Sequence, residues 1–338
     1  MAAVWRVGRT CRRLRSPTVR RALAAIVAVG MVVGALLVRS RVDDNRERKH
    51  TVLRLVCAEE LEQACDAIQA DPGSKVEVTV EPAGDTEARL AKQGGADVDG
   101  WLVPAPWAGL VDEVRARNQL PARFGSSGAP IARSPLVIAM WADRAAALRA
   151  ACGGQVGWKC IGDHVGPPTS IKATHADPTT SATGLLVLGQ AVASFFGRAD
   201  LSTTDVDASD PFDGWFAGLE QSVPPFADDP FDLMLVQGRS FADAVGTTEA
   251  KAKAVLADRG GSDVTLLYPS PMATADLVLA PVAGRDRAAT LAGVVRGAVG
   301  RRALADAGWQ VPGPAGPFGL PSPGFLDALR QRWREVVR

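Results

Sequence analysis

The segment His175-Ala-Asp-Pro-Thr-Thr-Ser-Ala-Thr-Gly184 joins a short strand to a long apolar helix and decides the fold. We predict the strand over residues 170–175 and the helix over residues 181–196, because Pro178 cannot continue a strand ladder. Free N–H groups and the positive dipole end of such a helix bind anionic or polar groups. Hydroxyl side chains, which could add donors, lie at Thr179, Thr180, Ser181 and Thr183. The turn is therefore a candidate ligand-binding site, and helix capping is its ordinary alternative.

A second turn repeats this arrangement. Residues 242–245 are predicted as a strand, Gly246-Thr247-Thr248-Glu249 follows, and a helix is predicted over residues 249–257. Ligands of open α/β sheets bind beyond the carboxyl ends of strands, where such turns converge. Thr248 therefore joins the candidate ligand-binding residues.

Strands and helices alternate along most of residues 51–338. Further strands are predicted over residues 51–57, 76–80, 97–103, 135–141 and 264–268. Further helices are predicted over residues 59–68, 86–93, 107–117, 142–151, 286–307 and 324–337. This rhythm predicts an α/β fold with parallel sheets covered on both faces.

The charge is distributed unevenly along the chain. Residues 1–50 hold 12 Lys and Arg against 3 Asp and Glu, whereas residues 51–338 hold 26 against 34. The body is therefore acidic and lacks the basic surface that phosphate backbones require, so we expect no nucleic-acid partner.

The amino terminus predicts attachment to a membrane. Seven arginines within residues 1–21 precede an uncharged apolar run over residues 22–38. This pattern predicts a cytoplasmic basic segment, a transmembrane signal anchor, and a charged tether over residues 39–50 that leads to an extracytoplasmic body. A cleaved signal peptide is the alternative, but no convincing small-x-small cleavage site follows the apolar run.

The cysteines agree with export. Cys11 falls on the predicted cytoplasmic side, and the remaining four form two groups that are each eight residues apart in sequence. Local closure, Cys57 with Cys65 and Cys152 with Cys160, is the simplest pairing, although sequence alone leaves other pairings and free thiols open. Zinc ligation is disfavoured because neither group has CxxC spacing.

Catalytic and metal-binding signals are weak. His164 follows Asp163 and His175 lies near Asp177, but a proline-containing loop separates these two pairs. The chain contains no GxSxG nucleophile motif. We therefore expect a binding protein without catalysis, metal or cofactor. Trp107, at a predicted strand-to-helix turn, is a candidate for stacking on a ligand.

The order of the motifs in residues 51–338 resembles the bacterial extracellular solute-binding proteins of the type II periplasmic-binding fold, especially the membrane-anchored actinobacterial kind. The resemblance rests on Ala96-Asp-Val-Asp-Gly-Trp-Leu-Val-Pro104, Ile131-Ala-Arg-Ser-Pro-Leu-Val-Ile-Ala139, Asp177-Pro-Thr-Thr-Ser-Ala-Thr-Gly-Leu-Leu186, Thr248-Glu249, Tyr268-Pro269 with Asp276, and Gly300-Arg-Arg-Ala-Leu-Ala-Asp-Ala-Gly-Trp309. It implies two α/β lobes that close by a hinge on a small ligand in the cleft between them.

This resemblance assigns residues to the lobes and the cleft. Lobe 1 would comprise residues 51–134, lobe 2 residues 135–272, and residues 273–338 would return to lobe 1 and add the C-terminal helices. Ser134 would face the cleft from the crossing strand. The hydroxyl residues of the two turns would approach the ligand from lobe 2.

The chain departs from the family pattern in lobe 1. Many members place a serine after the first strand, whereas this chain has Ala58-Glu59-Glu60, and Pro104-Ala105-Pro106 replaces polar residues after the third strand. These departures argue against a free oxyanion ligand. They leave a cationic or amphoteric ligand, with Glu59 as a binding candidate, or a cleft that has lost ligand binding.

The predicted function is a membrane-anchored, extracytoplasmic solute-binding protein that captures a small polar solute and could serve an ABC-type transporter. The alternative is a structural or regulatory envelope protein that uses the same fold to bind a protein partner, and the departures in lobe 1 favour it. An envelope hydrolase has the weakest support because no nucleophile can be paired with a base.

Overall fold

The computed structural model describes residues 52–94, 97–125, 128–167, 169–223, 230–259, 263–311 and 320–337. The predicted basic segment, transmembrane anchor and charged tether lie outside these residues. Contacts divide the chain into a unit Met1–Val52 and a unit Leu53–Arg338, and the fold described below is that of the second unit. Within the described part of the chain, no helix combines the length and apolar character needed to cross a bilayer.

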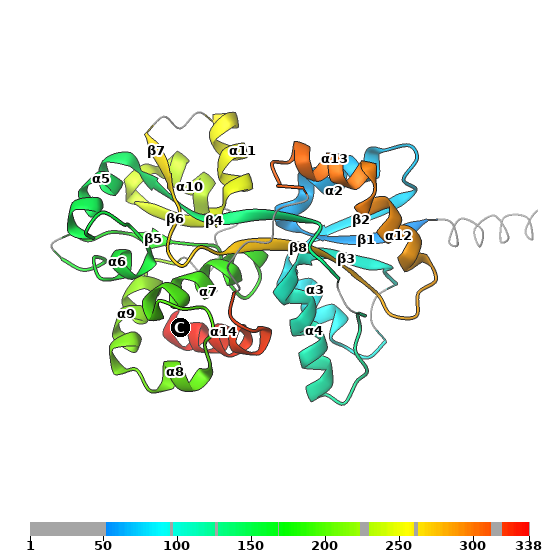
Figure 1. Ribbon diagram of the computed structural model, residues 1–338, viewed down its shortest axis with the longest axis horizontal. Coiled ribbons are helices and arrows are strands. Elements are labelled where there is room, and N and C mark those ends of the chain that lie inside the picture. Colours follow the sequence, from blue (N-terminus) through cyan, green and yellow to red (C-terminus); the bar gives the residue numbers. More distant parts are fainter. Residues whose placement is uncertain are drawn as a thin grey trace, which may run out of the picture. The chain divides into compact units, whose positions relative to one another are not determined.

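Eight strands form one mixed sheet in the order β2-β1-β3-β8-β4-β6-β5, with β7 paired to β4 (Figure 1). The strands are β1 (Leu53–Ala58), β2 (Val76–Glu81), β3 (Gly100–Pro104), β4 (Ala132–Trp141), β5 (Ala173–Thr174), β6 (Ala244–Thr248), β7 (Val264–Leu267) and β8 (Thr274–Pro281). The sequences of β1 and β3, LRLVCA and GWLVP, are almost entirely buried, as expected for strands covered on both faces.

Two long strands join the halves of the sheet. The first half contains β1, β2, β3 and β8, and the second half contains β4, β5, β6 and β7. Residues 132–135 of β4 pair with β8, whereas residues 136–140 pair with β6, so β4 connects the two halves (Figure 1). Parallel pairing holds for β1 with β2 and β3, but β8 runs antiparallel to β3 and β4. The predicted parallel pairing therefore holds for part of each half, including β5 with β6, whereas the antiparallel pairing of the long strands β4 and β8 was not predicted.

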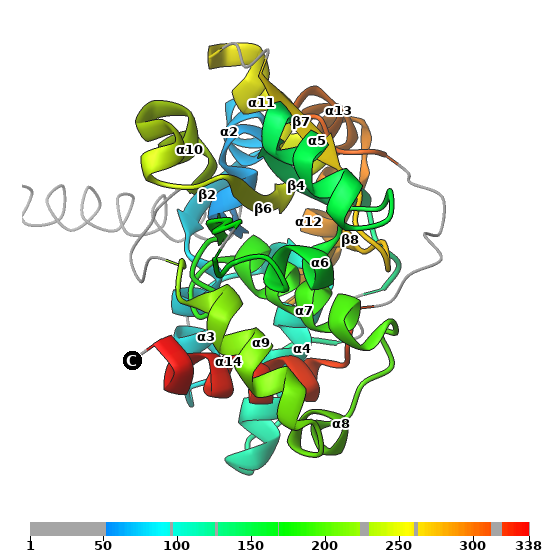
Figure 2. The same cartoon turned by 90° about the vertical axis from the view of Figure 1, so that its left-hand side faces the viewer.

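Helices cover both faces of each half. Around the first half lie a 3₁₀ turn η1 (Glu59–Leu61), α2 (Glu62–Ala70), α3 (Ala83–Leu90), α4 (Ala105–Arg117), α12 (Arg287–Arg296) and α13 (Ala298–Asp306). Around the second half lie α5 (Ala142–Ala151), α6 (Trp158–Gly162), α7 (Ala182–Phe196), α8 (Thr203–Asp207), α9 (Asp210–Glu220), α10 (Pro230–Gln237), η2 (Gly238–Ser240), α11 (Glu249–Arg259) and α14 (Pro323–Val337). Figure 2 shows α5, α10 and α11 on one face of the second half and α6, α7 and α9 on the other.

The sequence prediction missed several helices. The helix expected over residues 286–307 is two helices, α12 and α13, because Gly297 between them has an extended backbone. Helices α6, α8, α9 and α10 were not predicted. Their segments are short or rich in proline, glycine and acidic residues, so the apolar periodicity is weak.

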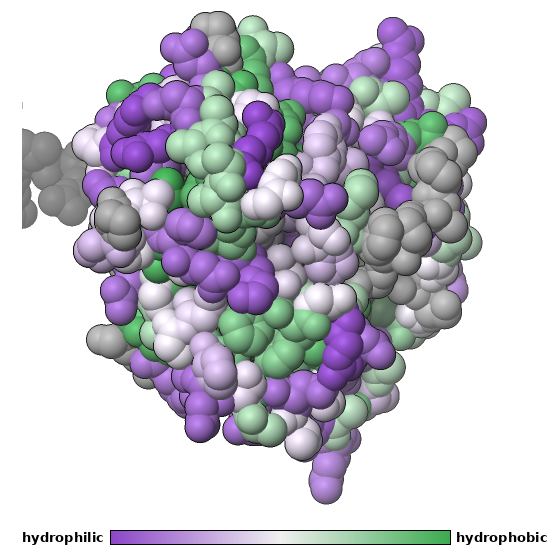
Figure 3. All heavy atoms as spheres, turned by 60° about the vertical axis from the view of Figure 1, so that its left-hand side comes forward, coloured by the Kyte–Doolittle hydropathy of each residue, from purple (hydrophilic) through white to green (hydrophobic). Residues whose placement is uncertain are grey.

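Helix α7 is central to the hydrophobic core. Every residue from Ala182 to Ser194 is buried. A smaller core lies between the second half of the sheet and helices α10 and α11, with Val137, Ala139, Phe231 and Met234 as members. On the outer face of the second half, hydrophobic patches alternate with hydrophilic ones (Figure 3).

Both predicted disulfides are present. Cys57 at the end of β1 is bonded to Cys65 in α2, and Cys152 after α5 is bonded to Cys160 in α6. The local pairing is therefore confirmed. The first disulfide encloses the turn that carries Glu59 and Glu60.

Candidate ligand-binding site

A cavity of about 470 Å³ lies where β1 and β6 end and α7 begins. Residues from both halves of the sheet line it. The first half contributes the turn after β1, and the second half contributes the start of α7, the end of β6, and helices α10 and α11. This is the edge of the sheet at which ligands of open α/β folds bind.

Most of the charged side chains that line the cavity are acidic. Glu59, Glu60 and Glu62 follow β1, and Asp232 lies in α10. Lys251 of α11 is the cation among the described lining residues. The carboxylates outnumber this ammonium, so the lining has an excess of negative charge, which favours cations over anions.

Glu60 is bound directly to the start of α7. The Ser181 hydroxyl and the backbone N–H of Thr183 each donate a hydrogen bond to Glu60 Oε1, both at 2.8 Å. Ser181 is also the N-cap of α7, because its Oγ accepts from the Gly184 N–H at 3.0 Å. A carboxylate of the chain itself therefore occupies donors at this helix end.

The first half contacts the same turn at two further points. The Gly84 N–H of α3 donates to the Thr180 carbonyl at 2.9 Å. A Cβ atom at Gly84 would lie 2.1 Å from the Thr179 carbonyl oxygen, so only glycine permits this approach. The Trp107 indole nitrogen lies 3.5 Å from the Ala182 carbonyl oxygen.

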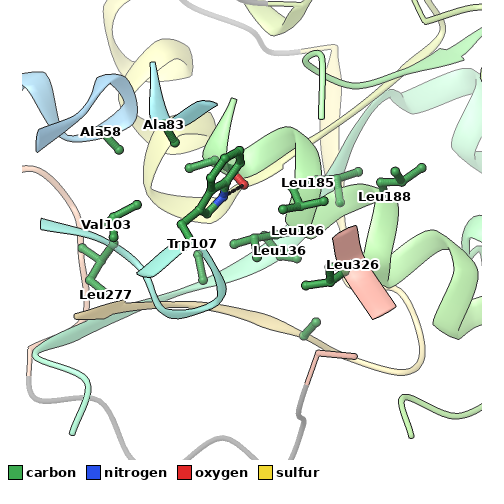
Figure 4. Close-up of a cluster of buried hydrophobic side chains, with 14 of the residues drawn as sticks. Ala58, Ala83, Val103, Trp107, Leu136, Leu185, Leu186, Leu188, Leu277 and Leu326 are labelled. Atoms are coloured by element: carbon green, nitrogen blue, oxygen red, sulfur yellow. Dashed lines mark hydrogen bonds between the residues drawn. The ribbon is translucent and has the colours of Figure 1, made fainter. Parts of the chain in front are cut away.

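Trp107 does not line the cavity. Its side chain is 0% exposed and lies among apolar side chains that include Val103, Leu185 and Leu186 (Figure 4). The Arg330 guanidinium lies 5.2 Å from its ring centroid. The structure thus gives Trp107 a packing position, and it presents no surface for the predicted ligand stacking.

The predicted hydroxyl residues fall into three groups. Ser181 and Thr183, together with Glu59, line the cavity. Ser134 is instead buried and accepts from the Ala250 N–H, and Thr248 Oγ1 accepts from the Lys251 N–H, so both satisfy donors at the start of α11.

The remaining two hydroxyl residues hold the turn itself. Thr179 donates both its hydroxyl and its backbone N–H to Asp177 Oδ1, each at 2.7 Å. Thr180 is exposed and does not line the cavity, and its carbonyl accepts from Gly84. The ordinary capping and turn interactions of Ser and Thr account for these placements and for those of Ser134 and Thr248.

Several lining residues were not predicted. Glu60 and Glu62 follow a strand end in the sequence Glu59-Glu60-Leu61-Glu62, a signal that could have identified them. Thr247 lines the cavity in place of Thr248 because successive side chains in β6 point to opposite faces. Asp232 was missed because α10 itself was not predicted.

His175 lies beneath the turn in a buried polar cluster. Its Nε2 lies 3.0 Å from Glu220 Oε2, its Nδ1 lies 2.7 Å from the Ala176 carbonyl oxygen, and Trp333 Nε1 donates to Glu220 Oε2 at 2.8 Å. Burial lowers the His175 pKa, but the charge and hydrogen bond of Glu220 outweigh it, so the pKa is raised overall. Both ring nitrogens face acceptors, an arrangement that favours the protonated ring, and these contacts tie His175 to the residues beneath the turn.

Among the described residues, one group of side chains lies close enough together to hold a metal ion. It consists of Cys152, Cys160 and His164. The two sulfur atoms are joined in a disulfide. The His164 ring nitrogen Nδ1 lies 2.7 Å from the Cys160 carbonyl oxygen. The oxidised group therefore offers no thiolates as ligands.

The sequence profile of the family described as bacterial extracellular solute-binding protein matches residues 53–310. The chain belongs to this family. No curated protein matches the sequence. The predicted resemblance to bacterial extracellular solute-binding proteins is thus confirmed.

Solved structures support the fold of this solute-binding protein. A periplasmic thiamin binding protein is 14% identical, with a TM-score of 0.59 over 85% of this chain and 96% of that chain. AfuA from Actinobacillus pleuropneumoniae, with fructose-6-phosphate bound, is 13% identical, with a TM-score of 0.57 over 85% and 98%. Iron-bound HitA from Pseudomonas aeruginosa is 14% identical, with a TM-score of 0.58 over 85% and 99%. These likenesses establish the α/β periplasmic-binding type of fold.

Proposed function

We propose that the protein captures a small cationic solute in the cavity between β1, β6 and α7, without catalysis. The observation that carries this proposal is the hydrogen bonding of the two carboxylate oxygens of Glu60. Its Oε1 accepts from Ser181 and Thr183, while its Oε2 is buried and has no hydrogen-bond partner within the described part of the chain. A buried carboxylate oxygen without a donor is costly, and a cationic solute with N–H groups would supply that donor once hinge opening exposes the oxygen.

Charge and size support the same class of ligand. Glu59, Glu62 and Asp232 add three carboxylates to the lining, against the ammonium of Lys251. A volume of about 470 Å³ lies within the range of sites that enclose small metabolites. Amines and amphoteric solutes with a net positive charge fit this lining, whereas a free oxyanion would meet repulsion.

Membrane attachment and delivery to a transporter belong to the same proposal. The arginine-rich residues 1–21 and the apolar residues 22–38 would form a signal anchor that keeps the body outside the cytoplasm. A captured solute would then be passed by hinge opening to an ABC-type transporter in the same membrane. Mass spectrometry of the mature protein tests the anchor, because a start between about residues 38 and 51 would show cleavage instead.

A thermal-unfolding screen tests ligand binding. The full chain is melted with polyamines, arginine, lysine and thiamin, beside sugars and inorganic anions. We expect a cation to raise the melting temperature by several degrees, because a ligand that binds only the folded state stabilises it. Glu62→Gln and Asp232→Asn should reduce this rise. Asp66→Asn, an equal change of charge on the exposed face of α2, should not.

An envelope protein that binds a protein partner remains the second candidate function. It is favoured by the contacts of Glu60 and Gly84, which occupy the α7 turn without any solute. If no solute in the screen changes the melting temperature of the wild type, this second function replaces the first. If the best solute is an anion, the cationic class is wrong.

A further inference from the structure

We infer that Glu60 is the residue that excludes anionic ligands, because its carboxylate occupies the position where an anion would bind to α7. The inference deepens the proposed function and rests on the cleft being a solute-binding site. It assigns to Glu60 a role in specificity that is separate from its contribution to the charge of the cavity.

The geometry at the start of α7 supports this assignment. The Thr183 N–H belongs to the first turn of a helix of 15 residues, where backbone donors have no partner within the helix. Glu60 Oε1 accepts from this N–H and from the Ser181 hydroxyl, both at 2.8 Å. Two donors converging on one oxygen at a positive helix end is the arrangement that holds a carboxylate, sulfate or phosphate.

The occupying carboxylate is held firmly from its own side. Glu60 lies in the turn that follows β1, and the Cys57–Cys65 disulfide closes the chain around this turn. The Gly84 N–H binds the neighbouring Thr180 carbonyl and keeps the first half against the α7 turn. An incoming anion would have to displace a carboxylate that is covalently part of the molecule, and it would meet Glu59 and Glu62 nearby.

Among the described lining residues, Glu60 differs from Glu62 in its contact with the start of α7. Glu62 also lines the cavity and is exposed, but Glu60 is the residue whose oxygen accepts from the start of α7. Loss of Glu62 therefore removes charge only. Loss of Glu60 removes charge and also releases two donors. This difference supplies a matched control.

The experiment compares four variants with the wild type by titration calorimetry and thermal unfolding. Sodium sulfate and inorganic phosphate are the probes, and sodium chloride at equal ionic strength is the reference. Glu60→Ser opens the position, Glu60→Gln fills it with a neutral side chain of the same shape, and Glu62→Ser removes charge only. The double variant Glu60→Ser with Ser181→Ala also lacks the hydroxyl donor. Glu60→Ala repeats the test if Glu60→Ser unfolds, and circular dichroism checks that each variant is folded.

We expect Glu60→Ser to bind sulfate at least about tenfold more tightly than the wild type, because two donors become available to a charged acceptor. Glu60→Gln and Glu62→Ser should stay near the wild type, and the double variant should lose most of the gain. Equal sulfate binding by Glu60→Ser and Glu62→Ser, or by Glu60→Ser and Glu60→Gln, would overturn the inference, because charge removal alone would then explain the gain. Tight sulfate binding by the wild type would overturn it as well.

This test is separate from that of the proposed function. If no cation stabilises the wild type but Glu60→Ser gains sulfate binding, the cationic function fails and the role of Glu60 stands. If a cation stabilises the wild type and Glu60→Ser gains nothing, the function stands and the role of Glu60 fails.

Discussion

Arg330 of α14 and Glu87 of α3 form a buried bidentate ion pair, with Nη1 to Oε2 at 2.6 Å and Nη2 to Oε1 at 2.9 Å. Asp327 accepts from the same guanidinium at 2.8 Å and pairs with Arg117 of α4. Helix α14 also contacts α7 and α9 of the second half. The C-terminal helix therefore links helices that cover the two halves of the sheet.

Removal of this guanidinium should destabilise the protein strongly. We expect Arg330→Met to lower the free energy of unfolding by about 3 to 5 kcal/mol, because Glu87 is left buried without its partner. The double variant Glu87→Gln with Arg330→Met should recover part of the loss, since it leaves no buried unpaired charge. Urea denaturation measures both. A double variant that is no more stable than Arg330→Met would contradict this account.

The His175–Glu220 pair should make stability depend on pH. The His175 pKa is raised in the folded protein, so the pair's contribution is fully present below the unfolded value of about 6.5 and is lost as the pH rises through the folded value. We expect the free energy of unfolding of the wild type to fall as the pH rises from about 6.5 through the folded pKa of His175. Denaturation of His175→Gln at several pH values should lack that decline.

His164→Gln is the matched control for this pH dependence. His164 is a half-buried histidine in the turn after α6, and its ring contacts Cys160 in place of a carboxylate. We expect this variant to keep the decline of the wild type. The assignment to His175 is wrong if His175→Gln keeps the decline or if His164→Gln removes it.

The elements that position the site followed from apolar periodicity. The strand at residues 51–57, the turn after His175 and the helix that begins near Ser181 were each predicted within a few residues of β1 and α7. The residue that binds the turn before α7, Glu60, could not be predicted. Ser181 meets Glu60, which lies 121 residues away in sequence, and no local pattern encodes such a contact.

Two physical reasons explain why Ser134, Thr248 and Trp107 lie away from the cavity. Ser134 and Thr248 are hydroxyl residues near the start of α11, and the sequence cannot distinguish a hydroxyl that satisfies the helix N–H groups from one that meets a ligand. Trp107 was misplaced because a tryptophan at a strand-to-helix turn can be exposed or buried. Its contact with the start of α7, and the packing of α7 against β3, place it in the core (Figure 4).

The two disulfides should differ in function but not in stability. Each closes a loop of equal sequence separation, 8 residues, so removing either should cost about 2 to 3 kcal/mol in the chain-entropy account. Cys57→Ala with Cys65→Ala should also weaken the cation response, because the loop carries Glu59 and Glu60. Cys152→Ala with Cys160→Ala should leave that response unchanged. Urea denaturation and the thermal screen together measure both effects, and equal loss of the cation response in both variants would refute the positioning role.

Gly84 should be required for the contact between α3 and the α7 turn. A Cβ atom there would lie 2.1 Å from the Thr179 carbonyl oxygen and 2.9 Å from the Thr180 Cα, and backbone atoms cannot yield as a flexible side chain would. We expect Gly84→Ala to lower the free energy of unfolding by about 1 to 3 kcal/mol, because α3 must move away and the hydrogen bond to Thr180 is lost.

Gly214→Ala supplies the control for this substitution. Gly214 lies within α9, and a Cβ atom there would meet nothing within 4 Å. Alanine in a helix interior is favoured over glycine by about 0.5 to 1 kcal/mol, so this variant should be slightly more stable than the wild type. Chemical denaturation of the two variants in parallel measures the difference. If Gly84→Ala were as stable as Gly214→Ala, α3 could approach the turn without a glycine, and the close contact would not hold the two halves together.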